Sequence, residues 1–116
     1  MKFYQYPKCS SCRKAKKWLD ANAIEVEAIH LVEETPDKET LKALWEKSGL
    51  PLKKFFNTSG GSYRALDLKN TYDDYSDDER LGLLADDGML IKRPLLELED
   101  SVLVGFKESV YEDALG

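Results

Sequence analysis

The sequence has no long apolar run, and no stretch approaches the roughly 20 apolar residues that a transmembrane helix requires. Its N-terminus reads Met-Lys-Phe-Tyr-Gln-Tyr and lacks the apolar core of a secretory signal peptide. It also has no repeats, low-complexity stretches or linkers. We therefore expect one domain over residues 1–116, a monomer in the cytoplasm that has no membrane partner.

Cysteine and histidine are scarce, with 2 cysteines and 1 histidine in the chain. Two cysteines three positions apart in a reducing compartment indicate redox or metal chemistry rather than a disulfide framework. A structural zinc site needs about four thiolate or imidazole ligands. The chain contains only Cys9, Cys12 and His30 as such ligands. We therefore expect no metal and no cofactor. Two buried structural cysteines remain the alternative interpretation.

Positive charge is in the minority, with 17 Lys and Arg against 22 Asp and Glu and a net charge of -5. Affinity for nucleic acid comes mainly from Lys and Arg on phosphates, so we expect no direct binding of nucleic acid. One basic run stands out after Cys12, and it is either a solvated helix face or a source of anion attraction near Cys9. Its residues are Arg13, Lys14, Lys16 and Lys17.

The first 30 residues predict a strand, a helix and a second strand. Residues 2–6 are rich in aromatic side chains, as is typical of a short strand. A helix follows from Ser10 to about residue 23, because apolar side chains recur at three- and four-residue spacing. Residues 24–29 alternate between apolar and polar side chains, the period of a half-buried strand. This βαβ unit places both cysteines at its first strand-to-helix turn.

The middle of the chain predicts further helices. Thr35 as cap residue, followed by Pro36 and acidic residues, begins a helix that Gly49 ends. Residues 52–56 predict a short helix before a loop at residues 57–61. Ser76 caps another helix, whose apolar stripe extends toward residues 89–90.

The C-terminal part predicts a hairpin and a last helix. Residues 95–98 and 102–104 are apolar runs separated by a turn, and a short helix opens at residues 105–108. The whole order predicts an α/β, thioredoxin-like fold. It consists of a small mixed β-sheet flanked by helices, with a helical insertion at about residues 36–90.

The two cysteines are expected to differ in reactivity. The thiolate is the nucleophile, and the N–H groups and dipole at a helix N-terminus stabilise it at Cys9. Lys8 and Arg13 add positive potential nearby. Cys12 lies one turn inside the helix on its apolar face, where it should be more buried and less ionised. Because this spacing brings the two sulfurs within reach of a disulfide, we expect Cys9 to attack and Cys12 to resolve the mixed disulfide.

Three segments resemble the arsenate reductase/Spx family. They are residues 6–14, which read Tyr-Pro-Lys-Cys-Ser-Ser-Cys-Arg-Lys, residues 90–95 and residues 104–108. The segments occur in the order in which the family has them, and the resemblance covers essentially the whole chain. The resemblance implies a thioredoxin-like fold, a catalytic thiolate at Cys9, and Arg93 facing an oxyanion beside a cis proline at Pro94. An arginine fits that place because its guanidinium can fork onto two oxygens.

The chain departs from the glutaredoxin-dependent arsenate reductases of that family at three positions. Those enzymes carry serine where Cys12 stands, and arginines at the positions that resemble Asn57 and Lys107. Arg64 is close to the first of these but out of register. The anion-binding candidates are therefore Lys8, Arg13, Arg93 and Lys107.

The Spx-like members keep both cysteines as a redox switch and bind the C-terminal domain of the RNA polymerase α subunit. Gly49 lies near the loop glycine that they use for this contact. They carry residues past the last helix, whereas this chain ends at Gly116 just after its own. Two functions are therefore expected. The favoured one is a thiol oxidoreductase that cycles Cys9 and Cys12 and is coupled to thioredoxin or glutaredoxin. The alternative is a redox-sensing transcriptional regulator that binds RNA polymerase.

Overall fold

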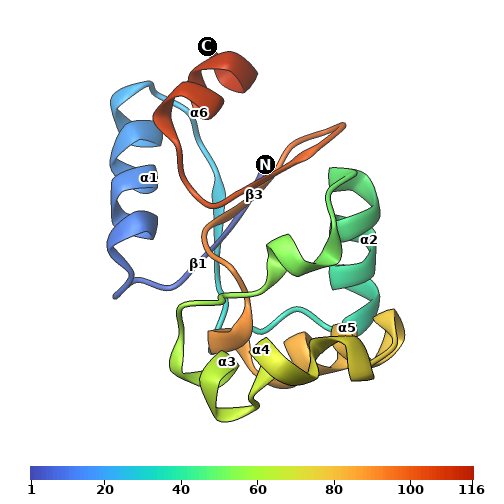
Figure 1. Ribbon diagram of the computed structural model, residues 1–116. Coiled ribbons are helices and arrows are strands. Elements are labelled where there is room, and N and C mark those ends of the chain that lie inside the picture. The colour runs from blue at the N-terminus through green and yellow to red at the C-terminus, as the bar shows by residue number, and fades with distance from the viewer.

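The computed structural model describes residues 1–116 (Figure 1). A βαβ unit at the N-terminus is separated from a C-terminal hairpin and helix by a run of helices. The elements in chain order are β1 (Lys2–Gln5), α1 (Ser10–Ala21), β2 (Glu27–His30), α2 (Lys38–Ser48), α3 (Gly61–Ala65), α4 (Leu68–Thr71), α5 (Asp77–Asp86), β3 (Leu95–Glu97), β4 (Val102–Val104) and α6 (Glu108–Leu115). Short 3-10 helices cover Leu52–Phe55, Tyr72–Asp74 and Gly88–Leu90.

The strands form one mixed sheet in the order β2-β1-β3-β4. β1 runs parallel to β2 and antiparallel to β3, and β3 and β4 form an antiparallel hairpin. Phe3 in the middle of β1 pairs with Ala28 on one side and with Leu96 on the other. The predicted α/β fold, a small mixed sheet with helices, is confirmed.

Two hydrophobic cores lie on opposite faces of the sheet. Phe3 and Leu96 face α1 and α6 and pack with Ala15, Leu19 and Tyr111. Their neighbours Tyr4 and Leu95 point the other way, because successive side chains of a strand alternate between faces, and pack against the helices of the insertion. Figure 1 accordingly shows α1 and α6 together on the left and α2 to α5 on the right and below.

The expected bounds of the second strand were wrong. The strand begins at Glu27 rather than at residue 24, and its first hydrogen bond runs from the Glu27 N–H to the Met1 carbonyl at 2.9 Å. Ala23 has a φ of 56°, so the chain turns in the left-handed region just after α1. Ile24 and Val26 are apolar because they pack on the Phe3 core, and they lie outside the strand.

The cap expected for the second helix was also misplaced. The N-cap of α2 is Asp37, whose carboxylate accepts a hydrogen bond from the Thr40 N–H at 2.8 Å. The Thr35 hydroxyl instead donates to the Leu31 carbonyl at 2.6 Å. The end of the helix is as predicted, since Gly49 has a φ of 68° and terminates α2 in the left-handed conformation.

Within the insertion, α5 begins as predicted. The Ser76 hydroxyl accepts from the Glu79 N–H at 3.1 Å, and the Glu79 carboxylate accepts from the Ser76 N–H at 2.9 Å, which together form a capping box. The helix ends at Asp86, and residues 88–90 form a separate 3-10 turn. The loop expected at residues 57–61 gives way to α3 at Gly61. Neither α3 nor α4 was predicted.

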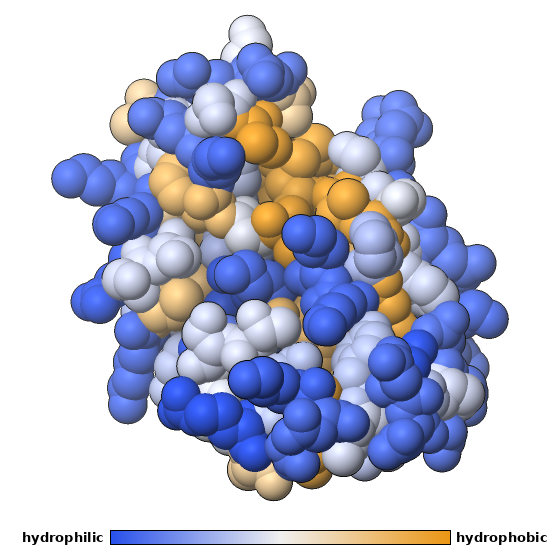
Figure 2. All heavy atoms as spheres, viewed as in Figure 1, coloured by the Kyte–Doolittle hydropathy of each residue, from blue (hydrophilic) through white to orange (hydrophobic).

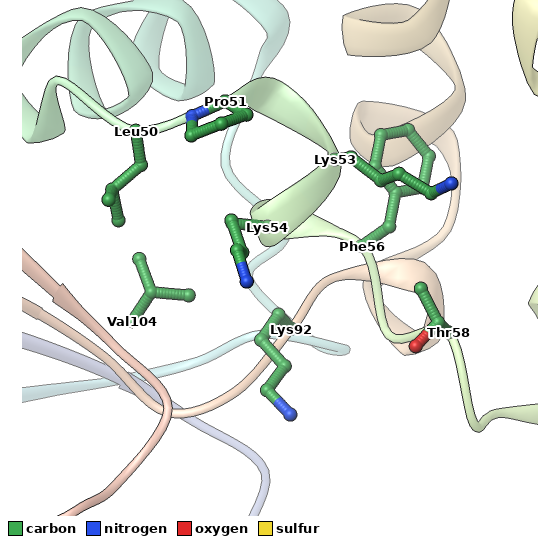
Figure 3. Close-up of a pocket in the computed structure, with 8 residues that line it drawn as sticks. All are labelled: Leu50, Pro51, Lys53, Lys54, Phe56, Thr58, Lys92 and Val104. Carbon is green, nitrogen blue, oxygen red and sulfur yellow. The ribbon is translucent and has the colours of Figure 1, made fainter.

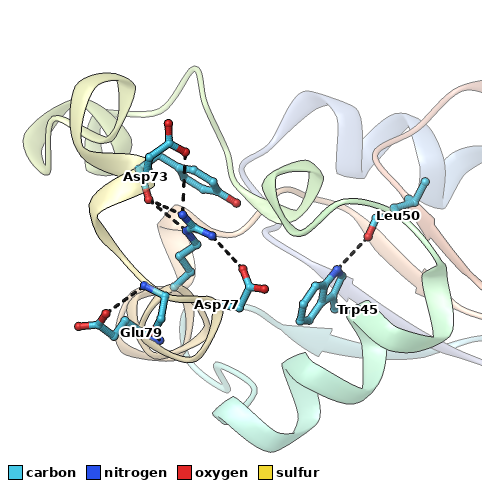
Figure 4. A network of polar contacts seen from close by, with 8 residues as sticks. Trp45, Leu50, Asp73, Asp77 and Glu79 are labelled. Atoms are coloured by element: carbon cyan, nitrogen blue, oxygen red, sulfur yellow. Dashed lines mark hydrogen bonds and ion pairs between the residues drawn. The ribbon is translucent and has the colours of Figure 1, made fainter.

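Arg80 ties α5 to the rest of the insertion (Figure 4). Its guanidinium donates to the Asp77 carboxylate at 2.8 Å and to the Tyr72 carbonyl, also at 2.8 Å. The same guanidinium lies 4.1 Å from the centroid of the Tyr72 ring. On the other side, the Trp45 indole N–H donates to the Leu50 carbonyl at 2.8 Å and holds the turn after α2.

The insertion returns to the sheet alongside its own beginning. Phe56 and Ile91 form an isolated antiparallel bridge. Flanking it, the Asn57 N–H donates to the Leu90 carbonyl at 2.7 Å and the Lys92 N–H donates to the Phe55 carbonyl at 2.8 Å. The next residue along the chain is Arg93, so this bridge positions the segment that leads to the predicted site.

The helices of the structure are all too short or too polar to span a membrane.

Candidate functional site

Cys9 is the residue directly before α1 and caps its N-terminus in an extended conformation, with φ -86° and ψ 126°. The chain leaves β1 at Gln5 and turns tightly, so that the Cys9 N–H donates to the Tyr6 carbonyl at 2.9 Å. The Cys9 carbonyl accepts the first hydrogen bond of the helix, from the Arg13 N–H at 3.1 Å. The half-buried sulfur therefore lies where a helix presents unpaired N–H groups.

The surroundings of Cys9 favour its thiolate. Burial on its own would raise the pKa of Cys9, because a thiolate loses hydration there. Hydrogen bonds from the backbone and the thiol of Cys12, from the Arg93 guanidinium and from the Ser11 N–H act in the opposite direction. They outweigh burial, and the pKa of Cys9 lies below that of an ordinary thiol. The lower pKa raises the thiolate fraction at neutral pH.

Cys12 has the opposite character. Its side chain is 0% exposed, and its sulfur accepts a long hydrogen bond from the Tyr6 N–H at 3.5 Å. Burial raises the pKa of Cys12 to about 12, and the hydrogen bond to Cys9 and the negative charge on Cys9 act in the same direction. Both cysteines are free thiols in the structure. Cys12 thus holds its proton more tightly than an ordinary thiol, whereas Cys9 loses its proton more readily.

Arg93 lies beside the cysteine pair on the segment that leads into β3. The Arg93–Pro94 peptide bond is cis. The guanidinium donates to the Met89 carbonyl at 3.3 Å, and its Cζ lies 5.3 Å from the centroid of the Tyr6 ring. The Arg93 Nε is buried and has no hydrogen-bond partner. Next to a thiolate, the free Nε–H of this guanidinium can donate a hydrogen bond to an oxyanion or to a leaving thiolate.

The other predicted anion-binding residues make no contact with the cysteine pair like that of Arg93. Lys8 is exposed in the turn before α1, Arg13 is exposed on its first turn, and neither side chain makes a hydrogen bond or an ion pair. Lys107 is the exposed N-cap residue of α6, and its side chain also has no polar partner. The Asn57 amide reaches the Met89 carbonyl at 3.5 Å, the same oxygen that Arg93 contacts.

Several groups at the site escaped the sequence interpretation. Tyr6 supplies both the N–H that binds Cys12 and the ring under Arg93, and Ser11 supplies an N–H to Cys9. Main-chain donors carry no residue signature, so only the aromatic side chain before the cysteine loop could have signalled this role. No group of 3 or more His, Cys, Asp or Glu side chains gathers anywhere in the structure as a metal site.

A dithiol at the start of the first helix, beside a cis proline that precedes the third strand, is the arrangement of a thioredoxin-like protein. Residues 4–114 match the ArsC family, so the chain belongs to that family. This membership agrees with the resemblance of the three motifs.

The relatives include uncharacterised proteins, regulators and reductases. The uncharacterised protein YusI of Bacillus subtilis is 60% identical over 111 residues, which cover 96% of this chain and 94% of YusI. The regulatory protein MgsR of the same organism is 34% identical over 104 residues, covering 90% of this chain and 81% of MgsR. The crystal structure of a possible arsenate reductase from Streptococcus mutans UA159 superimposes with a TM-score of 0.88 and 51% identity, covering 97% of this chain and 95% of that one.

Proposed function

We propose that this protein is a cytoplasmic thiol–disulfide oxidoreductase that cycles Cys9 and Cys12 between dithiol and disulfide. The observation that carries the proposal is the placement of the two thiols, because Cys9 is half-buried at the N-terminus of α1 and Cys12 is fully buried one turn inside the helix. The pKa of Cys9 is accordingly lowered and that of Cys12 is raised to about 12. The attacking cysteine reacts as a thiolate, whereas the resolving cysteine can stay protonated until the mixed disulfide has formed. Membership of the ArsC family supports the same chemistry.

In the first step the Cys9 thiolate attacks one sulfur of a substrate disulfide. A bond forms between that sulfur and Cys9, the substrate S–S bond breaks, and the second substrate sulfur leaves as a thiolate. The hydrogen bonds that lower the pKa of Cys9 come from the helix start and from Arg93. A guanidinium there also stabilises the negative charge that passes to the leaving sulfur.

In the second step Cys12 resolves the mixed disulfide. Once Cys9 is covalently bound, the thiolate charge and the hydrogen bond that help to hold the Cys12 proton are gone. Cys12 then ionises more readily and attacks the Cys9 sulfur, and the remaining substrate sulfur leaves with the electron pair of the broken bond. A dithiol reductant of the thioredoxin or glutaredoxin type would return the electron pair and restore both thiols.

The test is oxidation followed by mass analysis. Mild oxidant should produce a monomer that has lost two hydrogens, with a disulfide bond between Cys9 and Cys12. Cys12→Ser should trap mixed disulfides at Cys9, and Cys9→Ser should trap none. Thioredoxin and glutaredoxin, supplied separately, should differ in the rate at which they reduce the disulfide. An unchanged mass after oxidation, or intermolecular dimers alone, would remove the proposal.

A second candidate is a redox-sensing regulator that docks on the C-terminal domain of the RNA polymerase α subunit. The kinship with the regulatory protein MgsR and the pair of cysteines favour it. Passing the oxidised and the reduced protein over the immobilised domain tests this candidate, with the Cys9→Ser, Cys12→Ser double variant as a control. Retention that depends on the disulfide supports the regulator, and absence of retention in both states rejects it.

A further inference from the structure

A hollow of about 660 Å³ opens between the insertion and the end of the hairpin (Figure 3). Leu50 and Pro51, from the turn after α2, face Val104 of β4 across it. Lys54 and Lys92 border its open side. The volume is within the range of sites that hold small ligands or short peptide segments.

The cations of this hollow lack anionic partners in the chain. Lys53, Lys54 and Lys92 line it, and no carboxylate does. None of the three ammonium groups takes part in an ion pair, although Asp and Glu outnumber Lys and Arg across the whole sequence. The Lys53 ammonium lies 5.2 Å from the centroid of the Tyr72 ring. Like charges that line one hollow repel one another, and a bound anion lowers this repulsion.

A second hollow of about 480 Å³ continues the first, because Lys53 and Thr58 line both. It adds Arg64 and Lys69, whose side chains also make no ion pair. Its only carboxylate is Asp67, which accepts a hydrogen bond from the Asn70 amide at 2.8 Å. The two hollows together form an elongated basic trough along the insertion, which we call the lysine trough.

One end of the lysine trough is apolar. Leu50 is 38% exposed and is one of five large hydrophobic residues that are exposed in this protein. The hydrogen bond from the Trp45 indole to the Leu50 carbonyl fixes the turn that presents it. Figure 2 shows apolar side chains gathered in the hollow between the hairpin and the insertion, with hydrophilic side chains along its lower border. Exposed apolar surface rimmed by polar residues is typical of an interaction site.

We propose that the lysine trough binds an acidic segment of a partner protein. Carboxylates of the segment face Lys53, Lys54 and Lys92, and an apolar side chain of the segment packs between Leu50 and Val104. An extended segment fits better than a compact anion, because the cations spread over two hollows and an apolar wall closes one end. The inference goes beyond the proposed thiol chemistry and does not depend on it.

The experiment measures binding alone, with both cysteines reduced. The probe is a fluorescein-labelled peptide of sequence Glu-Glu-Leu-Glu-Glu-Leu, followed by fluorescence anisotropy, with Gln-Gln-Leu-Gln-Gln-Leu as the matched neutral peptide. The acidic peptide should bind, with an affinity that falls as salt is added. The double variant Lys54→Glu, Lys92→Glu should weaken binding by about tenfold or more.

Charge reversal elsewhere supplies the matched control. Lys17→Glu, Lys42→Glu changes the net charge equally on the exposed faces of α1 and α2, outside both hollows, and should leave most of the affinity. Leu50→Ser should weaken binding without changing its salt dependence. The proposal would be overturned by any of three results. The two double variants could lose affinity equally, the neutral peptide could bind as well as the acidic one, or citrate at the peptide's own concentration could displace the peptide. The last result would assign the trough to a compact anion.

Discussion

The guanidinium of Arg93 lies over the ring of Tyr6, 5.3 Å from its centroid, while the backbone N–H of Tyr6 binds the sulfur of Cys12 at 3.5 Å. Tyr6 thereby contacts the group that stabilises the Cys9 thiolate and also the buried thiol that follows. Its ring meets the His30 ring edge-on at 5.7 Å, which holds it against the end of β2.

Replacing Arg93 should make Cys9 less reactive. Arg93→Ala removes a charged hydrogen-bond donor from the thiolate, so the pKa of Cys9 should rise and its alkylation at neutral pH should slow by about tenfold. Arg93→Lys keeps the charge but not the planar, forked donor group. Its Cys9 pKa and alkylation rate should lie between those of the wild type and of Arg93→Ala. Ultraviolet absorbance of the thiolate against pH measures the change. An unchanged titration in Arg93→Ala would show that the helix start alone lowers the pKa of Cys9.

The two cysteines should be alkylated at very different rates. Cys9 has a lowered pKa and a half-buried sulfur, whereas Cys12 is fully buried with a pKa of about 12. At neutral pH, iodoacetamide should therefore modify Cys9 at least about a hundredfold faster. Peptide mapping after short exposure gives both rates, and Cys9→Ser gives the rate of Cys12 alone. Faster labelling of Cys12 would reverse the assignment of nucleophile and resolving thiol.

Cys12 should make the protein less stable in alkali. Below the unfolded thiol pKa of about 8.5 both states hold the proton, so this group does not change stability with pH. From there up to about pH 12 the unfolded chain binds fewer protons than the folded protein, so the free energy of unfolding falls as pH rises. Urea unfolding across this range should show a shallower fall in Cys12→Ala. Parallel curves would mean that folding does not raise the pKa of Cys12.

Oxyanions should bind weakly. Arg93 is close to the thiolate, but the Asn57 amide is turned to the Met89 carbonyl and Lys107 is exposed before α6. Each missing charged contact removes roughly 1.5–3 kcal/mol, so affinity for sulfate or arsenate should be millimolar at best. Arg93→Ala should abolish it. Chemical-shift titration measures the binding, and efficient arsenate reduction with glutaredoxin would contradict the expectation.

Gly88 should not tolerate a side chain. A Cβ at this buried position would overlap the Leu31 carbonyl oxygen, so Gly88→Ala should lower the free energy of unfolding by about 1–3 kcal/mol. Gly82→Ala is the control, because a Cβ there meets nothing within 4 Å and alanine favours the interior of α5. Urea unfolding of both variants checks the difference in sign. A neutral Gly88→Ala would indicate that residues 88–90 can move away from Leu31.

The sequence allowed the fold and the cysteine pair to be predicted because both rest on local signals. The apolar runs of the C-terminal hairpin, the cap residue Ser76 and the helix-ending Gly49 each have a fixed structural meaning, and the structure agrees with them. The start of β2 and the cap of α2 were missed because they depend on tertiary contacts. Ile24 is apolar through packing rather than through pairing, and the Thr35 hydroxyl binds Leu31.

The site could be predicted only in part. Helix position alone indicates which cysteine has the lower pKa. It does not reveal the Tyr6 N–H that binds the Cys12 sulfur or the burial that raises the pKa of Cys12. Likewise, counting charges predicts an acidic surface. Only the folded insertion brings Lys54 and Lys92, which are far apart in the sequence, to one hollow.

The bridge between Phe56 and Ile91 joins the segment that lines the lysine trough to the segment that leads to Arg93. Three consecutive residues on each strand of this bridge, 55–57 and 90–92, are clamped by hydrogen bonds of 2.7 and 2.8 Å, and Arg93 is the next residue along. Lys54 directly precedes the first of these two segments, and Arg93 directly follows the second. The lysine trough and the guanidinium beside Cys9 are therefore attached to the same short two-stranded segment.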